Sequence, residues 1–343
     1  MVKKYQISAA GSYEQLKIIQ ESMPVPGEEE VLVETIAIGV NFADTLVRIG
    51  VYESAKKLVG WPITPGFEFS GKVIAVGARV KNHQVGDLVF GLVFFGAYAT
   101  HIVAKSDQVF TIPKNVSAIE MAGFLAVYLT AFHCLNQIVR IYPKSTVLIH
   151  SAAGGVGTAL VQLSREYGYN IVAVVGSARK VEYVRALGVD RIILRSDKMW
   201  AEISAAAPEG YDVIFDANGS ESFKKGYRLL KPTGKLICYG SHSLLSKKGG
   251  RLNYAKALWG MWKTPKFNPL SMITHNKTVS GFNLSFLFSR KDLIEECVTS
   301  LMGLLAQGKI KPLKVTEFAF GDAASAHRLI ESGESVSKIV LKV

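Results

Sequence analysis

The sequence is poor in cysteine. Its 343 residues contain three, Cys134, Cys238 and Cys297, and these lie far apart. No two of them form a Cys-x-x-Cys pair, which excludes a cysteine-rich structural zinc site, and their spacing does not suggest a secreted disulfide scaffold. The opening residues, MVKKYQISAAGSYEQ, contain no apolar run before a cleavage site. We therefore expect no signal peptide and a cytoplasmic protein.

Acidic residues are absent from one long stretch. The whole chain has 40 Lys and Arg against 28 Asp and Glu, a net charge of +12. Between Ser222 and Lys291 there is no Asp or Glu, whereas the same stretch holds 14 of the basic residues. The positive charge is therefore a local property of this region and not a general basic coat.

Long apolar runs are also scarce. Residues 88–104 are uncharged, but the run is too short for a bilayer crossing and is interrupted by Gly91 and Gly96. Residues 121–139 are uncharged as well, yet they contain Thr130, His133, Asn136 and Gln137. We interpret this second run as a buried helix and not as a membrane span.

The sequence pattern of the first third of the chain is typical of a β-rich domain. Hydrophobic residues make up 49% of the sequence, enough for a large core, and the length suggests two domains. Short runs rich in β-branched and aromatic residues alternate with Gly and Pro. These runs predict strands at residues 30–40, 67–77, 87–93 and 97–104.

The middle of the chain changes to alternating strands and helices. Strands are predicted at residues 146–150, 170–175, 191–194, 211–215 and 235–239, and helices at 154–168 and 178–187. This alternation is typical of a doubly wound parallel sheet with right-handed crossovers. The fold class is therefore α/β.

The regular alternation of strands and helices ends after Gly240, and the sequence pattern of the tail again resembles that of the first third. The tail predicts strands at residues 277–284 and 336–343 and helices at 291–307 and 323–330. We therefore expect residues 1–123 and 278–343 to form one β-rich domain. Residues 124–277 would form an inserted nucleotide-binding domain with a basic insert at 241–277.

The strongest local motif is a glycine-rich turn. Residues 147–157 read Val-Leu-Ile-His-Ser-Ala-Ala-Gly-Gly-Val-Gly, so that a buried strand runs into a turn that opens a helix. Gly154 lets the backbone approach a pyrophosphate, Gly157 permits close packing of helix on strand, and the helix N-terminus favours phosphate. Ala152 replaces the usual first glycine. In this context the motif predicts a dinucleotide site.

The end of the second strand of this domain indicates which dinucleotide is bound. An NAD site places Asp or Glu there to accept hydrogen bonds from the ribose. This chain instead reads Val-Gly-Ser-Ala-Arg-Lys at residues 175–180. Ser177, Arg179 and Lys180, with Arg195 after the third strand, can meet a 2′-phosphate. The sequence therefore favours NADP(H).

Several motifs together resemble a known family. They are Gly-Val-Asn-Phe-Ala-Asp at residues 39–44, Gly-Val-Tyr at 50–52, Pro-Gly-Phe-Glu-Phe-Ser-Gly at 65–71, Leu-Thr-Ala-Phe at 129–132, the glycine-rich turn, and Lys-Ile-Val-Leu at 338–341. The chain resembles the medium-chain dehydrogenase/reductases, and within them the zinc-free quinone oxidoreductase branch that includes zeta-crystallin. The stretches at 226–235 and 281–284 and the basic insert point to its vesicle amine transport protein-like group.

The resemblance implies a GroES-like substrate domain and a Rossmann domain that binds NADP(H). Asn41 and Thr130 would face the nicotinamide. The turn residues Ala153, Gly154, Gly155 and Val156 would hold the pyrophosphate, while Ser177, Lys180 and Arg195 would surround the 2′-phosphate. Tyr239, Gly240, Phe282 and Asn283 would flank the dinucleotide. Because the family's last strand lies near a dimer contact, a homodimer is expected.

The resemblance also argues against a metal. Zinc-dependent relatives have Cys where Asn41 stands and His where Phe67 stands, and neither residue here is a good zinc ligand. Glu68 is then left without partner ligands. We expect direct hydride transfer to a quinone or an α,β-unsaturated carbonyl, with Tyr52 holding the developing oxyanion and Asn41 positioning the ring. A merely packed Tyr52 is equally compatible with the sequence. His101, His133 and His150 are interpreted as core residues.

A second hypothesis comes from the basic insert. Trp259 and Trp262 alternate there with Lys256, Lys263 and Lys266. This mixture suits weak contact of residues 241–277 with an anionic membrane, and the protein would then be an NADPH-binding scaffold or membrane-surface factor with little catalysis. The same segment could instead form a lid on the substrate cleft. We find no helix-turn-helix or zinc-finger signature and expect no specific nucleic-acid partner.

Overall fold

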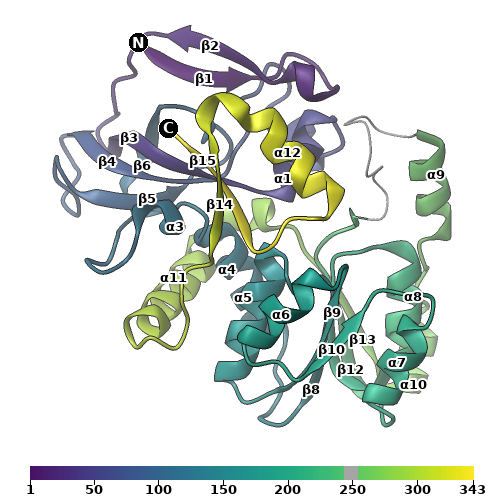
Figure 1. Cartoon of the computed structure of the whole chain (residues 1–343). Helices are drawn as coiled ribbons and strands as arrows, with labels where there is room; N and C mark the ends of the chain where they lie inside the picture. The colour runs from purple at the N-terminus through teal and green to yellow at the C-terminus, as the bar shows by residue number, and fades with distance from the viewer. Residues whose placement is uncertain (243–253) are drawn as a thin grey trace. The chain divides into compact units, whose positions relative to one another are not determined.

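The computed structural model describes residues 1–242 and 254–343, which divide into two compact units (Figure 1). The first unit consists of Met1–Val127 and Pro312–Val343. The second extends between them, from Tyr128 to Lys311. Each unit has its own sheet, and each is described separately below.

The first unit is built on a seven-stranded sheet. Its strands are β3 (Glu30–Val40), β4 (Glu68–Val76), β5 (Leu88–Leu92), β6 (His101–Lys105), β7 (Val109–Thr111), β14 (Val315–Ala319) and β15 (Lys338–Lys342). A separate hairpin of β1 (Val2–Gln6) and β2 (Lys17–Glu21) and the helices α1 (Phe42–Arg48), α2 (Glu53–Leu58), α3 (Ala118–Met121) and α12 (Ala323–Ser332) complete it. This is the expected β-rich domain.

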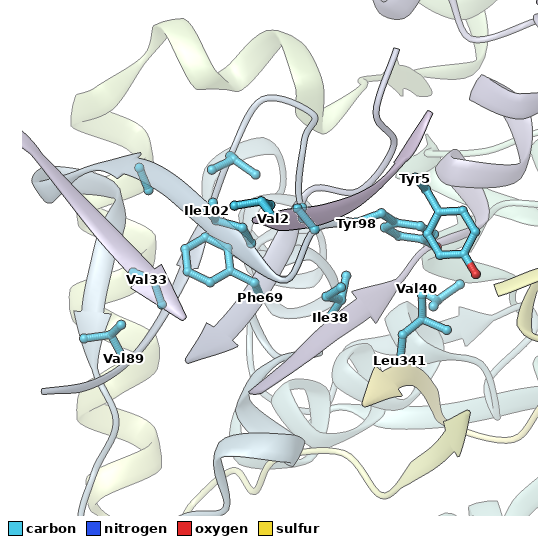
Figure 2. Close-up of a cluster of buried hydrophobic side chains, with 14 of the residues drawn as sticks. Val2, Tyr5, Val33, Ile38, Val40, Phe69, Val89, Tyr98, Ile102 and Leu341 are labelled. Carbon is cyan, nitrogen blue, oxygen red and sulfur yellow. The ribbon is translucent and has the colours of Figure 1, made fainter. Parts of the chain in front are cut away.

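The two ends of the chain meet in this sheet. Strand β15 pairs antiparallel with β3, with Ile339 opposite Val40, and parallel with β14. Figure 2 shows side chains from both ends, such as Tyr5, Ile38, Phe69 and Leu341, in one buried cluster. The last part of the tail, from Pro312, therefore belongs to the same unit as the first third of the chain. Strand β15 has a neighbouring strand on each side, so a homodimer cannot form by pairing a further strand with it. The homodimer itself stays a prediction.

The second unit contains a six-stranded parallel sheet in the order β10-β9-β8-β11-β12-β13. The strands are β8 (Thr146–Ile149), β9 (Asn170–Val175), β10 (Arg191–Leu194), β11 (Tyr211–Asp216), β12 (Leu230–Cys238) and β13 (Thr278–Gly281). Reading outward from β8, the first strand, this is the doubly wound order of a Rossmann domain. The predicted fold class is confirmed.

Helices connect these strands. They are α5 (Gly155–Glu166), α6 (Arg179–Ala186), α7 (Met199–Ala206), α8 (Ser220–Leu229), α9 (Tyr254–Lys263) and α10 (Pro269–His275), and a further helix, α11 (Lys291–Ala306), follows β13. The uncharged run at 121–139 forms α4 (Leu125–Phe132), which continues as a π-helical turn, His133–Ile138. Across the described ranges, no helix combines the length and apolar character that a bilayer crossing needs.

Both expected boundaries differ from the structure. The first unit continues to Val127 and not only to residue 123, and residues 278–311, expected in the first domain, belong to the second unit. The reason for the second difference is a contact that local sequence does not reveal. Strand β13 is the sixth strand of the parallel sheet, where Lys235 of β12 lies opposite Thr278.

A fully buried arginine ties α1 to α12 within the first unit. The Arg48 guanidinium forms an ion pair with Glu331 and donates to the Gly11 carbonyl oxygen at 2.6 Å. Its Nε donates to Nδ1 of His327 at 3.3 Å, and its Cζ lies 4.4 Å from the centre of the Tyr13 ring. Burial and the neighbouring Arg48 charge lower the pKa of His327 to about 3. His327 is therefore neutral, and its Nδ1 accepts the hydrogen bond that Arg48 donates.

Replacement of Arg48 tests how far this contact holds the unit together. Arg48→Met leaves the Glu331 carboxylate without its buried partner, and losing one member of such a pair costs about 3–5 kcal/mol. We expect the free energy of unfolding, from urea denaturation, to fall by that amount. Arg79→Met, which removes an exposed ion pair with Glu28, should change it by less than about 1 kcal/mol. Equal losses in the two variants would contradict this.

Candidate functional site

The predicted cofactor residues of the second unit gather at one edge of its sheet. The glycine-rich turn follows β8, Ser177 follows β9, and Arg195 follows β10. Tyr239 and Gly240 follow β12, and Phe282 and Asn283 follow β13. All these strands are parallel, so their carboxyl ends share an edge, which is where doubly wound sheets bind ligands.

A side chain on Gly157 would collide with the backbone of the glycine-rich turn itself. A Cβ on Gly157 would lie 2.3 Å from the carbonyl oxygen of Ser151, which no real side chain tolerates. A Cβ on Gly154 would lie 3.3 Å from the same oxygen. Gly154 is the N-cap residue of α5, and Ala152 is buried. The turn thus brings bare backbone to the N-terminus of a 12-residue helix, an arrangement that suits a phosphate.

The three residues predicted for a 2′-phosphate differ in exposure. The Ser177 hydroxyl oxygen is buried and has no hydrogen-bond partner among the described residues. Arg195 is exposed, and its backbone N–H donates to the Val175 carbonyl oxygen at 2.9 Å, which places it beside the end of β9. Lys180, in the first turn of α6, is only 7% exposed. Arg195 is therefore the most accessible of the three residues for an anion.

Asn218 joins this group and was missed by sequence reasoning. Its Oδ1 accepts hydrogen bonds from Nη2 of Arg195 and from the Ser151 hydroxyl, both at 3.3 Å. It therefore links the glycine-rich turn to the basic residue after β10. The available signal was its place after a buried strand of a parallel sheet.

His150 and Asp216 lie buried beneath the same edge. Neither ring nitrogen of His150 has a hydrogen-bond partner among the described residues, and burial lowers its pKa. Oδ1 of Asp216 accepts the backbone N–H of Asn218 at 2.7 Å. His150 is thus a core residue, as predicted.

The remaining predicted residues of the second unit lie around the π-helical turn. Thr130 is in α4, and His133 follows one turn later, its ring 4.7 Å from that of Phe282 at a steep angle. Nδ1 of His133 lies 2.6 Å from Oε1 of Gln137, so it carries the proton there. Asn283 caps the next turn by accepting from the Ser285 N–H at 3.0 Å.

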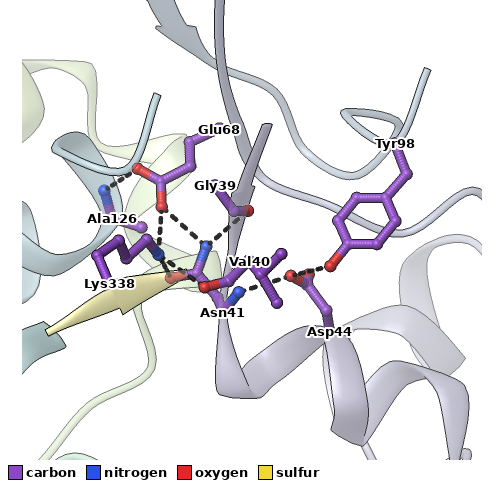
Figure 3. A network of polar contacts seen from close by, with 8 residues as sticks. All are labelled: Gly39, Val40, Asn41, Asp44, Glu68, Tyr98, Ala126 and Lys338. Atoms are coloured by element: carbon purple, nitrogen blue, oxygen red, sulfur yellow. Dashed lines mark hydrogen bonds and ion pairs between the residues drawn. The ribbon is translucent and has the colours of Figure 1, made fainter. Parts of the chain in front are cut away.

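Asn41, the predicted nicotinamide contact in the first unit, lies in a polar network (Figure 3). Its Nδ2 donates to Oε1 of Glu68 at 2.9 Å, and its Oδ1 accepts from Nζ of Lys338 at 2.7 Å. Lys338 and Glu68 form an ion pair of 2.8 Å, with side chains 3% and 1% exposed. Glu68 lacks partner ligands for a metal, as expected, and instead has an ammonium and an amide as partners. Sequence reasoning missed the role of Lys338, which begins strand β15.

The network continues to Asp44 on α1. Oδ2 of this buried carboxyl accepts the Asn41 backbone N–H at 2.8 Å and the Tyr98 hydroxyl at 3.1 Å. Burial raises the pKa of Asp44 to about 7, and the Asn41 hydrogen bond and the Lys338 charge oppose that rise. The start of α1, and with it Asn41, is therefore held by buried polar groups.

Tyr52, the predicted oxyanion donor, lies in a different cluster. Its ring packs edge-on against Phe67 and Phe95, with ring centres 5.9 and 6.3 Å away. The residue is half-buried, and α2 begins directly after it. The structure thus shows a packed aromatic body and leaves the role of the hydroxyl as a prediction.

The residues present do not fit a catalytic zinc site. Phe67 packs among aromatic rings, and Asn41 is engaged by Glu68 and Lys338. Within residues 1–242 and 254–343, no group of three His, Cys, Asp or Glu side chains is arranged to hold a metal ion.

Comparison with known proteins places the chain among dehydrogenases. Residues 27–114 match the alcohol dehydrogenase GroES-like domain, and residues 187–341 match the zinc-binding dehydrogenase domain. The synaptic vesicle membrane protein VAT-1 homolog of Danio rerio is 34% identical over 337 residues, which cover 98% of this chain and 69% of that protein.

Solved structures agree over the full length. The quinone oxidoreductase of Pseudomonas syringae pv. Tomato DC3000 is 26% identical with a TM-score of 0.85, and the match covers 100% of both chains. A mycobacterial protein complexed with NADPH is 25% identical with a TM-score of 0.85, again over 100% of both chains. The chain therefore belongs to the medium-chain dehydrogenase/reductase family of oxidoreductases, and VAT-1 homologues are among its relatives.

Proposed function

We propose that this protein is a zinc-independent NADPH-dependent reductase that transfers a hydride to a quinone or an α,β-unsaturated carbonyl. The observation that carries the proposal is the gathering of the glycine-rich turn, Ser177 and Arg195 at one sheet edge without an acidic residue after β9. In this proposal the second unit binds the cofactor and the first unit contributes the substrate side.

Three features support NADPH as the cofactor. Gly154 brings backbone without a side chain to the N-terminus of α5, where a pyrophosphate can bind, and Gly157 lets that helix pack closely on the turn. The unpartnered Ser177 hydroxyl and the exposed Arg195 guanidinium can both donate to a 2′-phosphate, which NADH lacks. A mycobacterial protein with the same fold has been solved with NADPH.

The mechanism follows from what the chain's own residues can do. Bound NADPH supplies the hydride. Asn41, held by Glu68 and Lys338, orients the nicotinamide side of the site, and the Tyr52 hydroxyl donates to the acceptor oxygen where negative charge develops. Because the residues at the metal-ligand positions of the zinc relatives are poor zinc ligands here, the proposed reaction needs an acceptor that is already activated, as quinones and enones are.

An acceptor panel tests the proposed function. The purified protein should oxidise NADPH, followed by absorbance, with at least one quinone or enone and with no simple alcohol or ketone. Chelator should leave the rate unchanged, and elemental analysis should find no stoichiometric zinc. One zinc per chain, or a rate abolished by chelator, would overturn the mechanism. No oxidation with any acceptor would favour a binding protein with little catalysis.

Arg195→Ala tests the choice of cofactor. The variant should bind NADPH about tenfold more weakly, because a charge-assisted hydrogen bond contributes roughly 1.5–3 kcal/mol and Arg195 is partly screened by water. NADH affinity should not change, since NADH has no 2′-phosphate. Fluorescence titration of both cofactors measures this. Lys198→Ala, which removes an exposed charge nearby in the sequence, is the control. Equal weakening of NADPH and NADH would contradict the assignment.

A second candidate function, contact with an anionic membrane, is favoured by the exposure of α9 and α10. Residues 243–253 of the predicted insert lie outside the described residues. Trp259 and Trp262 are 57% and 77% exposed and stack with ring centres 5.3 Å apart. Leu258, Leu270 and Ile273 are exposed too. Nζ of Lys263 lies 4.8 Å from the Trp259 ring, so basic and aromatic groups share one surface.

Vesicle co-sedimentation tests this membrane contact. We expect pelleting with vesicles that contain phosphatidylserine at low salt, and less at high salt, because each basic residue near the surface contributes about 1 kcal/mol that salt screens. The double variant Trp259→Ser, Trp262→Ser should lose most of the binding. Tyr142→Ser, which removes an exposed aromatic ring elsewhere in the second unit, should not. An absence of pelleting at low salt would refute the membrane contact.

A further inference from the structure

The Lys338 ammonium is fully occupied by the protein itself. Its Nζ lies 2.9 Å from the Val40 carbonyl oxygen, 2.7 Å from Oδ1 of Asn41 and 2.8 Å from Oε1 of Glu68. An ammonium has three N–H donors, and here each has an acceptor. Lys338 therefore has no donor left for a substrate, and any influence on chemistry must pass through its neighbours.

The Asn41 amide lies between opposite charges. Its Oδ1 faces the Lys338 ammonium and its Nδ2 faces the Glu68 carboxylate. A rotation of the amide by half a turn would place its NH₂ against the ammonium and its oxygen against the carboxylate. Both contacts would then be repulsive in a site where burial strengthens electrostatics. One of the two amide orientations is thus strongly selected.

The surrounding backbone is shaped to admit both charged side chains. A Cβ on Gly39 would lie 2.6 Å from Cγ and Oε1 of Glu68. A Cβ on Gly123 would lie 2.5 Å from Cγ of Lys338. The second carboxylate oxygen of Glu68 accepts the Ala126 backbone N–H at 2.9 Å. The two glycines therefore leave space for the pair, and the Ala126 N–H holds Glu68 independently of Asn41.

We propose that Lys338 and Glu68 are positioning residues that hold the Asn41 side-chain amide in a single orientation. The inference deepens the proposed function and rests on it for what Asn41 contacts during turnover. The fixed orientation itself is a property of the protein without cofactor.

The test uses a variant that removes both charges together. Lys338→Met alone would leave Glu68 as an unpaired buried carboxylate and could unfold the unit. The double variant Glu68→Gln, Lys338→Met removes the pair while keeping similar side-chain volumes. The matched control is Glu317→Gln, Lys342→Met, because that pair joins the neighbouring strands β14 and β15 with side chains 45% and 57% exposed.

The first measurement needs no activity. In protein labelled with ¹⁵N at asparagine, the Asn41 side-chain signal is identified by its loss in Asn41→Asp. The Asn41 side-chain amide proton that is hydrogen-bonded to Glu68 should resonate downfield of the side-chain amide protons of exposed asparagines. The shift should disappear in the Glu68→Gln, Lys338→Met variant and persist in the control. An Asn41 signal that is the same in all three proteins would overturn the proposal.

The second measurement asks whether the pair acts through Asn41. Asn41→Ala should lower kcat about tenfold in the natural protein but less than about twofold in the Glu68→Gln, Lys338→Met background, because residues of one network are not additive. Additive losses would show that the pair has only a structural role. If the natural protein reduces no acceptor, the proposed function fails, and the NMR measurement alone then decides the positioning role.

Discussion

The antiparallel pairing of β15 with β3 is the contact on which the first unit depends. It brings the last strand of the chain into the middle of a sheet that is otherwise formed mainly by the first third. Its register places Ile339 opposite Val40, and the pairing of β3 with β4 places Gly39 opposite Glu68. Lys338, Asn41 and Glu68 therefore meet because two strand registers coincide at one point. The placement of these charged groups next to one another is a consequence of the sheet.

Local sequence predicted the elements well where a run of residues determines its own structure. The strands Glu30–Val40, Asn170–Val175 and Arg191–Leu194 have the bounds expected from their β-branched runs. Non-local features were harder. The β1–β2 hairpin was not predicted, and β13 was assigned to the wrong domain because its partner, β12, lies 40 residues earlier, across the basic insert. A strand's neighbours depend on the whole sheet and not on its own residues.

The same distinction holds at the site. The glycine-rich turn could be predicted because its chemistry is contained in eleven consecutive residues, 147–157. Asn218 could not, since its value lies in contacts with Ser151 and Arg195, residues that only the fold brings near. Lys338 was visible as part of a family motif, but the role of this lysine is revealed only when its three acceptors are known. A buried polar network depends on contacts between residues that are far apart in the sequence.

The division of the first unit between the two ends of the chain also affects how the protein is made. A ribosome releases residues in order, and domains generally fold as units once their residues are available. The parallel sheet of the second unit is complete when β13 emerges, whereas the first unit still lacks β14, α12 and β15. Until β15 has been synthesised, β3 exposes the edge that β15 later covers. Of the two units, the one whose synthesis begins first is thus the last to be complete, and its open strand edge needs protection in the nascent chain.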